Sequence, residues 1–209
     1  MRNYENLEFR GIQYRIYYPV NYRKDQKYPV FYHLHGSGSR GRDFEHFDDS
    51  SSLLRLIHAG GSPFDDLLCV FPQCSDDTWY DHFNDLLDLT KEVYNRPDVD
   101  QSRFNGSGIS MGGYGIYQVM MCLPELFHKA IVCCGGGMYW NAGRMKNIHF
   151  RIFHGAKDTA VFPEEAERMF HNLKEVGADV TLTIYPECYH DCWTKTYTNH
   201  ENLAWLLTL

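Results

Sequence analysis

The sequence lacks the apolar segments that mark membrane proteins and secreted precursors. Its 209 residues contain no apolar run near the roughly 20 residues that a membrane-spanning helix needs, since the best candidate, residues 130–134, stops at Gly135. Glu5 stands where a signal peptide would require an apolar stretch. We therefore expect no membrane span and a cytoplasmic location, with secretion left open if a leader preceded this sequence.

Metal-binding patterns and a basic surface are missing as well. The seven cysteines include no CxxC pair and match no zinc-site spacing, so reduced thiols and no metal ion are expected. Lys and Arg number 20 against 27 Asp and Glu, and this net charge of −7 argues against nucleic acid as a partner. Without repeats, low-complexity tracts or a Pro/Gly/Ser linker, residues 1–209 are expected to form one domain.

What the sequence does contain is a regular exchange of short apolar runs with longer amphipathic ones. Residues 67–71 are continuously apolar, as in a strand buried on both faces, and residues 83–96 space their apolar side chains like one helix face. Such alternation predicts an α/β fold, with a mostly parallel sheet and helices on both faces. The other predicted strands are residues 12–18, 28–34, 103–109, 129–134, 149–153 and 180–185, and the other predicted helices are residues 43–58, 111–122, 163–176 and 193–207.

The pentapeptide Gly108-Ile109-Ser110-Met111-Gly112 lies where a predicted strand ends and a predicted helix begins. Glycines two residues before and after a serine permit the tight turn, the nucleophile elbow, that presents a serine hydroxyl to a base. In this context Ser110 is the candidate nucleophile. An ordinary glycine-rich turn is the alternative interpretation, because small residues gather in many turns.

A serine nucleophile needs a base that takes its proton and later returns it to the leaving group. His190 follows the strand predicted at residues 180–185 and precedes the last predicted helix, so we assign the base to it. The histidines that compete for this role are His35, His154 and His200.

The base in turn needs a carboxylate that orients its ring. Asp158 lies just beyond the strand predicted at residues 149–153 and is the candidate acid. Glu187 is the rival acid. Asp191 is interpreted as a loop residue, because a sequence neighbour of His190 can rarely turn back to its ring nitrogen.

The oxyanion that forms when a carbonyl is attacked needs two hydrogen-bond donors. The backbone N–H of Met111, directly after the nucleophile, is the first candidate. The second is expected from the turn His35-Gly36-Ser37-Gly38, at Ser37, because small residues let the backbone approach a substrate. This turn lacks the GxxxxGK[ST] pattern, so it is not expected to cradle a nucleotide phosphate.

With these residues in place, the sequence resembles the α/β-hydrolase superfamily over nearly its whole length. Within it, the chain is similar to the compact serine esterases around esterase D, the feruloyl and acetylxylan esterases of carbohydrate esterase family one, and the phospholipase/carboxylesterase proteins. The resemblance is carried by residues 33–41, 108–115, 154–158 and 189–193, in the family's order. It implies the α/β-hydrolase fold and a triad of Ser110, Asp158 and His190, with neither a metal nor an organic cofactor.

The pocket is expected to be open and aromatic. Residues 135–147, where many α/β hydrolases insert a lid domain, number only 13, too few for a helical cap. Aromatic residues make up 15% of the chain, and several lie on loops beside the predicted site, where they either contact a substrate or simply pack. With the loop at residues 71–74, which looks like the family's substrate-facing loop, the candidate substrate-binding residues are Gln73, Trp79, Tyr139, Trp140 and Trp193.

The sequence thus predicts a serine carboxylic-ester hydrolase that works through an acyl-enzyme. Its expected substrates are small-molecule esters with short acyl, aromatic (feruloyl-type) or sugar-linked groups. A serine peptidase or acyl-peptide hydrolase is the alternative enzyme, because the same constellation serves amides. A non-catalytic binding module is the third hypothesis, because a fold does not fix a function.

Overall fold

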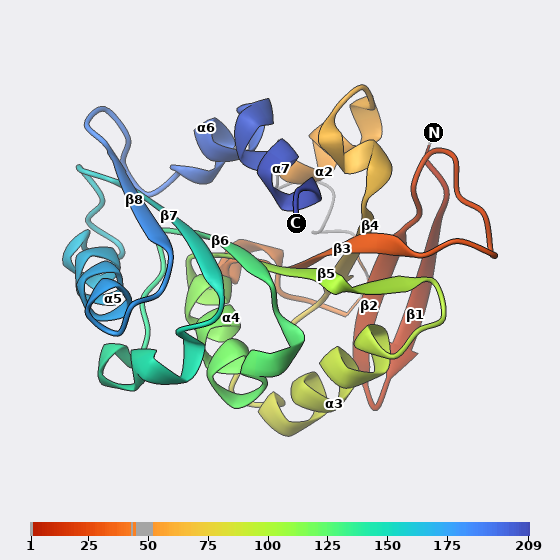
Figure 1. Cartoon of the computed structure of the whole chain (residues 1–209), viewed down its shortest axis with the longest axis horizontal. Coiled ribbons are helices and arrows are strands. Elements are labelled where there is room, and N and C mark those ends of the chain that lie inside the picture. The colour runs from red at the N-terminus through yellow and green to blue at the C-terminus, as the bar shows by residue number, and fades with distance from the viewer. Residues whose placement is uncertain (1, 43, 45–51) are drawn as a thin grey trace.

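An eight-stranded sheet lies at the centre of the computed structural model, which describes residues 2–42, 44 and 52–209 (Figure 1). Its strand order is β1-β2-β4-β3-β5-β6-β7-β8. The six strands from β4 to β8 in this order are parallel to one another, and β2 is antiparallel to both of its neighbours, β1 and β4. The predicted mostly parallel sheet is therefore confirmed. The strands are β1 (Tyr4–Phe9), β2 (Ile12–Tyr17), β3 (Tyr28–Leu34), β4 (Leu68–Pro72), β5 (Val99–Ile109), β6 (Lys129–Cys133), β7 (His149–Gly155) and β8 (Val180–Tyr185).

Helices cover both faces of this sheet (Figure 1). One face carries α3 (Phe83–Tyr94), α4 (Met111–Cys122) and α5 (Glu164–Glu175), and the other carries α2 (Ser52–Ala59), α6 (Trp193–Thr198) and α7 (His200–Leu207). Short 3-10 helices lie at η1 (Ser37–Ser39), η2 (Pro63–Asp66), η3 (Pro124–Leu126) and η4 (Tyr139–Met145). In the described part of the chain, every helix is too short or too polar to cross a membrane.

The helix α5 shows how the sequence places one of these covers. Its buried residues Ala166, Met169 and Leu173 recur at helical spacing and form the stripe that packs against the sheet. Three glutamates in its first turn and Lys174 in its last turn match the helix dipole. Where a lid domain would be inserted, the chain forms the seven-residue 3-10 helix η4.

The amino-terminal strand β1 is absent from the sequence prediction. It pairs with β2 through a turn in which Arg10 and Gly11 both have positive φ (49° and 85°), a conformation typical of tight hairpins. Four of its six residues are exposed, because it lies at the sheet edge, so it has no continuous apolar pattern to recognise. The strand β5 also begins at Val99, four residues before its predicted start, with exposed polar residues in its first part.

The last helix, predicted as one unit over residues 193–207, is two helices. Asn199 separates α6 from α7, and its side chain accepts a hydrogen bond from the Glu201 N–H (2.9 Å), as an N-cap does. His200 is therefore the exposed first residue of α7 rather than an interior helix residue. Of the helix predicted at residues 43–58, the structure describes α2; residues 43 and 45–51 lie outside the described residues.

Candidate active site

Ser110 occupies the turn between β5 and α4, at the carboxyl ends of the parallel strands. Its backbone has φ 52° and ψ −121°, a conformation that residues with a side chain rarely adopt. A methyl group on Gly108 would lie 2.2 Å from the carbonyl oxygen of Gly112, and one on Gly112 would lie 2.0 Å from that of Leu34. The two glycines of the GxSxG pattern are thus what allows α4 to begin so close to β3 and β5.

Hydrogen bonds hold this strained turn in place. The Ser110 N–H donates to the carbonyl oxygen of Cys133 on β6 (3.0 Å). The Ser110 carbonyl accepts from the N–H groups of Gly113 (2.8 Å) and Tyr114 (3.2 Å), in the first turn of α4. The side chain is left to project from the turn, with its hydroxyl 2.9 Å from Nε2 of His190.

The structure brings His190 and Asp158 together beside Ser110. Nδ1 of His190 lies 2.7 Å from Oδ2 of Asp158. Because an ionised carboxylate only accepts hydrogen bonds, Nδ1 carries the ring proton, and Nε2 is left with the lone pair that faces the Ser110 hydroxyl. This tautomer is the one in which the imidazole can remove a proton from the serine.

The Asp158 side chain is fully buried (0% exposed), and yet it is ionised. Oδ1 accepts from the N–H groups of Ala160 (2.9 Å) and Val161 (3.0 Å), while Oδ2 faces His190. Desolvation acts to raise the pKa of Asp158, but the hydrogen bonds from His190 and the two amides outweigh it, so the pKa lies below its ordinary value. The loop of Asp158 is also connected to that of His190, because the Lys157 N–H donates to the Cys188 carbonyl (3.0 Å).

The rival acid Glu187 and the loop residue Asp191 are each held by other side chains. Glu187 is exposed and forms an ion pair with Lys195. Asp191 accepts from the N–H (2.9 Å) and hydroxyl (2.8 Å) of Thr194, at the start of α6. Both side chains therefore have local structural partners.

Met111 directly follows Ser110, and the turn that contains Ser37 approaches Ser110 at Gly36. Met111 is the first residue of α4, so its N–H is one of the four donors that a helix leaves unbonded at its start. Ser37 begins η1, in a turn that lies against the nucleophile, because a methyl group on Gly36 would be 3.4 Å from Cβ of Ser110. Because the sequence predicts an oxyanion donor at Ser37, we call residues 36–40 the oxyanion turn.

The buried His35 fixes the direction of the peptide between Gly36 and Ser37. Its Nδ1 donates to the Gly36 carbonyl (2.6 Å), and its Nε2 accepts from the Cys74 N–H (3.0 Å). Burial lowers the pKa of His35 to about 4, so the ring is neutral and satisfied on both sides. In a trans peptide the C=O and the next N–H point in opposite directions, so the Ser37 N–H points away from His35.

Gln73 and Trp79 support the oxyanion turn from the protein interior, in contrast to the substrate contacts expected from the sequence. They are 1% and 3% exposed. The Gln73 amide donates to the Ser39 carbonyl (3.1 Å) and accepts from the Phe44 N–H (3.2 Å). Trp79 donates to the His35 carbonyl (3.1 Å), and its ring centroid lies 4.8 Å from that of His35.

The other three predicted aromatic positions are at least partly accessible. Trp193 stands edge-on to His190, with ring centroids 5.5 Å apart. Tyr139 and Trp140 lie in η4 and pack edge to face, with centroids 5.1 Å apart. Trp140 is 66% exposed.

An apolar hollow of about 630 Å³ begins one helical turn from the nucleophile. Ser110, Tyr114 and Gln118 follow one another at i, i+4 and i+8 and so share one side of α4. The hollow is lined by Tyr80, Phe83, Tyr114, Gln118, Gly137 and Met138. The sequence analysis selected Trp79 and Tyr139, which are the sequence neighbours of Tyr80 and Met138. The helical spacing from Ser110 is the signal that could have identified Tyr114 and Gln118.

Tyr114 is a neutral phenol in the wall of this hollow. Burial, the nearby charge of Glu165 and a hydrogen bond to that carboxylate raise the pKa of Tyr114 to about 12. Apart from the hydroxyls of Tyr114 and Tyr80 and the Gln118 amide, the side chains around the hollow are apolar.

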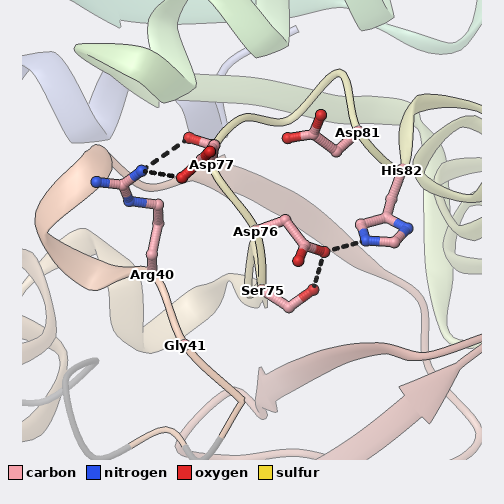
Figure 2. A pocket seen from close by; sticks show the side chains of 7 residues that line it. All are labelled: Arg40, Gly41, Ser75, Asp76, Asp77, Asp81 and His82. Atoms are coloured by element: carbon pink, nitrogen blue, oxygen red, sulfur yellow. Dashed lines mark hydrogen bonds and ion pairs between the residues drawn. The ribbon is translucent and has the colours of Figure 1, made fainter.

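A second hollow, of about 780 Å³, is polar and lies beside the oxyanion turn (Figure 2). Arg40 donates to the Ser37 carbonyl (2.9 Å) and forms an ion pair with Asp77 (3.5 Å), and Asp76 bonds to Ser75 and His82. Arg40 thus connects the oxyanion turn to Asp77 at the edge of this hollow. Its lining residues are Arg40, Gly41, Ser75, Asp76, Asp77, Asp81 and His82.

One set of three metal-donor side chains occurs in the described part of the chain. Donor atoms of Cys134, Asp158 and His190 lie within 4.8 Å of one another. Asp158 and His190 are already hydrogen-bonded, and burial raises the pKa of the Cys134 thiol well above its ordinary value. Because a cysteine binds a metal ion as the thiolate, these residues fit a hydrogen-bonded site better than a metal site.

The comparisons with known proteins identify the fold. No protein-family model and no curated protein matches the sequence. A thermostable esterase of known structure is 28% identical over 99% of this chain, with a TM-score of 0.81; this chain spans 62% of that protein. A feruloyl esterase module from Clostridium thermocellum complexed with sinapinate is 15% identical (TM-score 0.73; 99% of this chain, 86% of that one). The Pyrococcus horikoshii acylaminoacyl peptidase is 15% identical (TM-score 0.70; 96% and 40%). The chain has the α/β-hydrolase fold, as the sequence predicted.

Proposed function

We propose that this chain is a serine carboxylic-ester hydrolase that works through an acyl-enzyme. The observation that carries the proposal is the continuous contact from the Ser110 hydroxyl to Nε2 of His190 (2.9 Å) and from Nδ1 of His190 to Asp158 (2.7 Å). The likeness to a thermostable esterase over nearly the whole chain supports an ester as the substrate.

The geometry supports the following sequence of steps. Ser110 attacks the ester carbonyl carbon while Nε2 of His190 takes its proton, and the Asp158 carboxylate stabilises the imidazolium that results. The N–H groups of Met111 and Ser37 bind the oxyanion. When the tetrahedral intermediate collapses, the alcohol leaves with the proton from His190. A water molecule, activated by the same base, then releases the acid and restores Ser110.

The apolar hollow is our candidate for the acyl-binding pocket. Its volume of about 630 Å³ falls within the range of roughly 300–1,000 Å³ typical of small-molecule sites. The aromatic rings of Tyr80 and Phe83 favour a planar, feruloyl-type acyl group, and the sinapinate-bound feruloyl esterase module supports this choice. Trp193, beside His190, and Tyr139 and Trp140, which follow Met138, are candidates for contacts with the rest of the substrate.

Hydrolysis of a peptide bond is the second candidate function. The likeness to an acylaminoacyl peptidase favours it, since a serine triad can attack an amide as well as an ester. Parallel rates on p-nitrophenyl acetate, methyl ferulate, acetylated xylan and a peptide amide distinguish the two functions. Faster turnover of the peptide amide would replace the esterase assignment.

Replacement of the nucleophile tests both functions at once. Ser110→Ala is expected to lower kcat by a factor on the order of 10⁶, because losing a triad serine removes the covalent route. It should also abolish labelling by a fluorophosphonate. The matched control is Ser102→Ala, an exposed serine on the same strand, which should keep both properties. Activity of Ser110→Ala within tenfold of the parent would exclude Ser110 as the nucleophile.

A further inference from the structure

His154 is a fully buried histidine at the end of β7 that the steps above do not use. Its Nε2 lies 2.9 Å from the carbonyl oxygen of Val161 and 3.2 Å from Oδ2 of Asp158. Both neighbours accept hydrogen bonds, so Nε2 must carry a proton. The ring therefore offers a donor to the loop that holds the acid.

The other ring nitrogen of His154, Nδ1, indicates that the ring is present for its Nε2–H donor. Nδ1 is buried and, among the residues that the structure describes, has no hydrogen-bond partner. A proton on Nδ1 would be a buried donor without an acceptor, so the surroundings favour a proton on Nε2 over one on Nδ1. An unpartnered buried nitrogen costs stability that an apolar side chain of the same shape would not, so the polar contacts at Nε2 need an explanation other than packing.

Val161 connects His154 to Asp158 in a closed cycle. The Val161 N–H donates to Oδ1 of Asp158 (3.0 Å), while its carbonyl accepts from His154. The third side of the cycle is the approach of His154 to Oδ2, the same oxygen that faces Nδ1 of His190 (2.7 Å). The plane of the carboxylate sets the direction of the His190 N–H bond, so whatever holds this plane also holds the base.

We propose that His154 is a positioning residue that acts through Asp158 and Val161 to fix the orientation of His190. This inference rests on the proposed triad function. Without the Nε2–H donor, the Val161 carbonyl loses its partner, and the plane of the carboxylate is held only by the two amide hydrogen bonds to Oδ1 and by His190 itself. A misplacement of the reacting groups by about 1 Å costs on the order of 10² in rate. Because His154 is buried behind the acid, the effect should fall on kcat and leave KM unchanged.

Two amide substitutions test this role with little change in polarity. In His154→Gln the amide nitrogen reaches the position of Nε2, whereas in His154→Asn it ends near Nδ1 and cannot reach Val161. We expect His154→Gln to keep kcat within about threefold of the parent and His154→Asn and His154→Phe to lower it about 10- to 100-fold, with KM within about twofold. The control is Ile152→Val, on the same strand and equally buried, which should lower Tm but not kcat.

The outcomes separate this inference from the proposed function. A parent protein that neither hydrolyses esters nor labels at Ser110 refutes the function itself. An active parent whose folded His154→Asn variant keeps its kcat overturns the positioning role. If both impaired variants fail to fold, nitrogen NMR of the parent decides: the Nε2–H tautomer of His154 supports the role, and an Nδ1–H tautomer overturns it, because Nε2 would then have no proton to donate.

Discussion

Two buried histidines on and just after β3 should make the protein acid-sensitive well above the pH at which carboxylates titrate. Burial lowers the pKa of His33 to about 3 and that of His35 to about 4. In the unfolded chain both return to about 6.5. Below pH 6.5 the two histidines are therefore protonated in the unfolded state but not in the native state. Stability falls with falling pH until the pH reaches the pKa of each histidine in the native state.

The size of this effect follows from the width of the window. Each pH unit below 6.5 costs about 1.4 kcal/mol per group, so each histidine removes about 2 kcal/mol between pH 7.5 and pH 5.0. The two together remove about 4 kcal/mol from a total that is typically about 5–15 kcal/mol. Burial acts to raise the pKa of Asp158 and Asp98, but hydrogen bonds keep both pKa values below their ordinary values. The stability that these two carboxylates contribute is therefore lost only at lower pH.

Urea unfolding at pH 7.5 and pH 5.0, followed by tryptophan fluorescence, measures the difference. The informative variant is His33→Asn, whose amide can replace Nδ1 in its contact with Ser107 (3.1 Å) but does not titrate. It should reduce the difference to about 2 kcal/mol, because one of the two groups is gone. A parent protein that loses less than 1 kcal/mol, or a His33→Asn variant with the parent's full loss, would refute the assignment of the acid sensitivity to these rings.

Two further substitutions probe the acyl pocket and the carboxyl-terminal helices. Tyr80→Ala, at a wall of the apolar hollow, should raise KM for methyl ferulate about tenfold and leave KM for p-nitrophenyl acetate unchanged. The control Tyr4→Ala on β1 should change neither KM. Equal effects of Tyr80→Ala on both esters would exclude the hollow as the acyl site. Asn199→Ala removes the cap of α7 and should lower the free energy of unfolding by about 1 kcal/mol, and a loss below 0.3 kcal/mol in urea titrations would show that the cap is not needed.

The sequence is most informative where local pattern and topology agree. Ser110 is recognisable because its glycines lie between a predicted strand and a predicted helix, and both elements exist, although β5 begins four residues earlier than predicted. Asp158 and His190 follow from topology alone: each stands after a strand, and the carboxyl ends of neighbouring parallel strands meet at one edge. Local pattern was insufficient for β1, whose residues are mostly exposed, and for the break at Asn199, where an internal cap interrupts an otherwise helical pattern.

The side of a loop on which a residue faces is not encoded in such patterns. Alternation ends where a strand ends, so the sequence does not distinguish a loop aromatic that faces a ligand from one that faces the core. Gln73 and Trp79 follow β4, the sheet neighbour of β3, and their side chains turn inward to hold the oxyanion turn after β3. Tyr80, one residue later, turns toward the hollow. His154 is a similar case, because its proposed role depends on its contact with Val161, which forms only when the chain folds.

The order of strands also explains the run of small residues after β6. This strand lies between β5, which ends just before Ser110, and β7, which ends three residues before Asp158, so its loop passes between Ser110 and Asp158. There the chain reads Cys134-Gly135-Gly136, and a methyl group on Gly135 would lie 2.7 Å from Cα of Gly113 in the helix after the nucleophile. Larger side chains would separate the strand ends, and His190 would have to span a wider gap to touch both partners. Gly135 therefore helps to keep Ser110, Asp158 and His190 within contact of one another, as the two glycines around Ser110 do, although the GxSxG pattern does not include it.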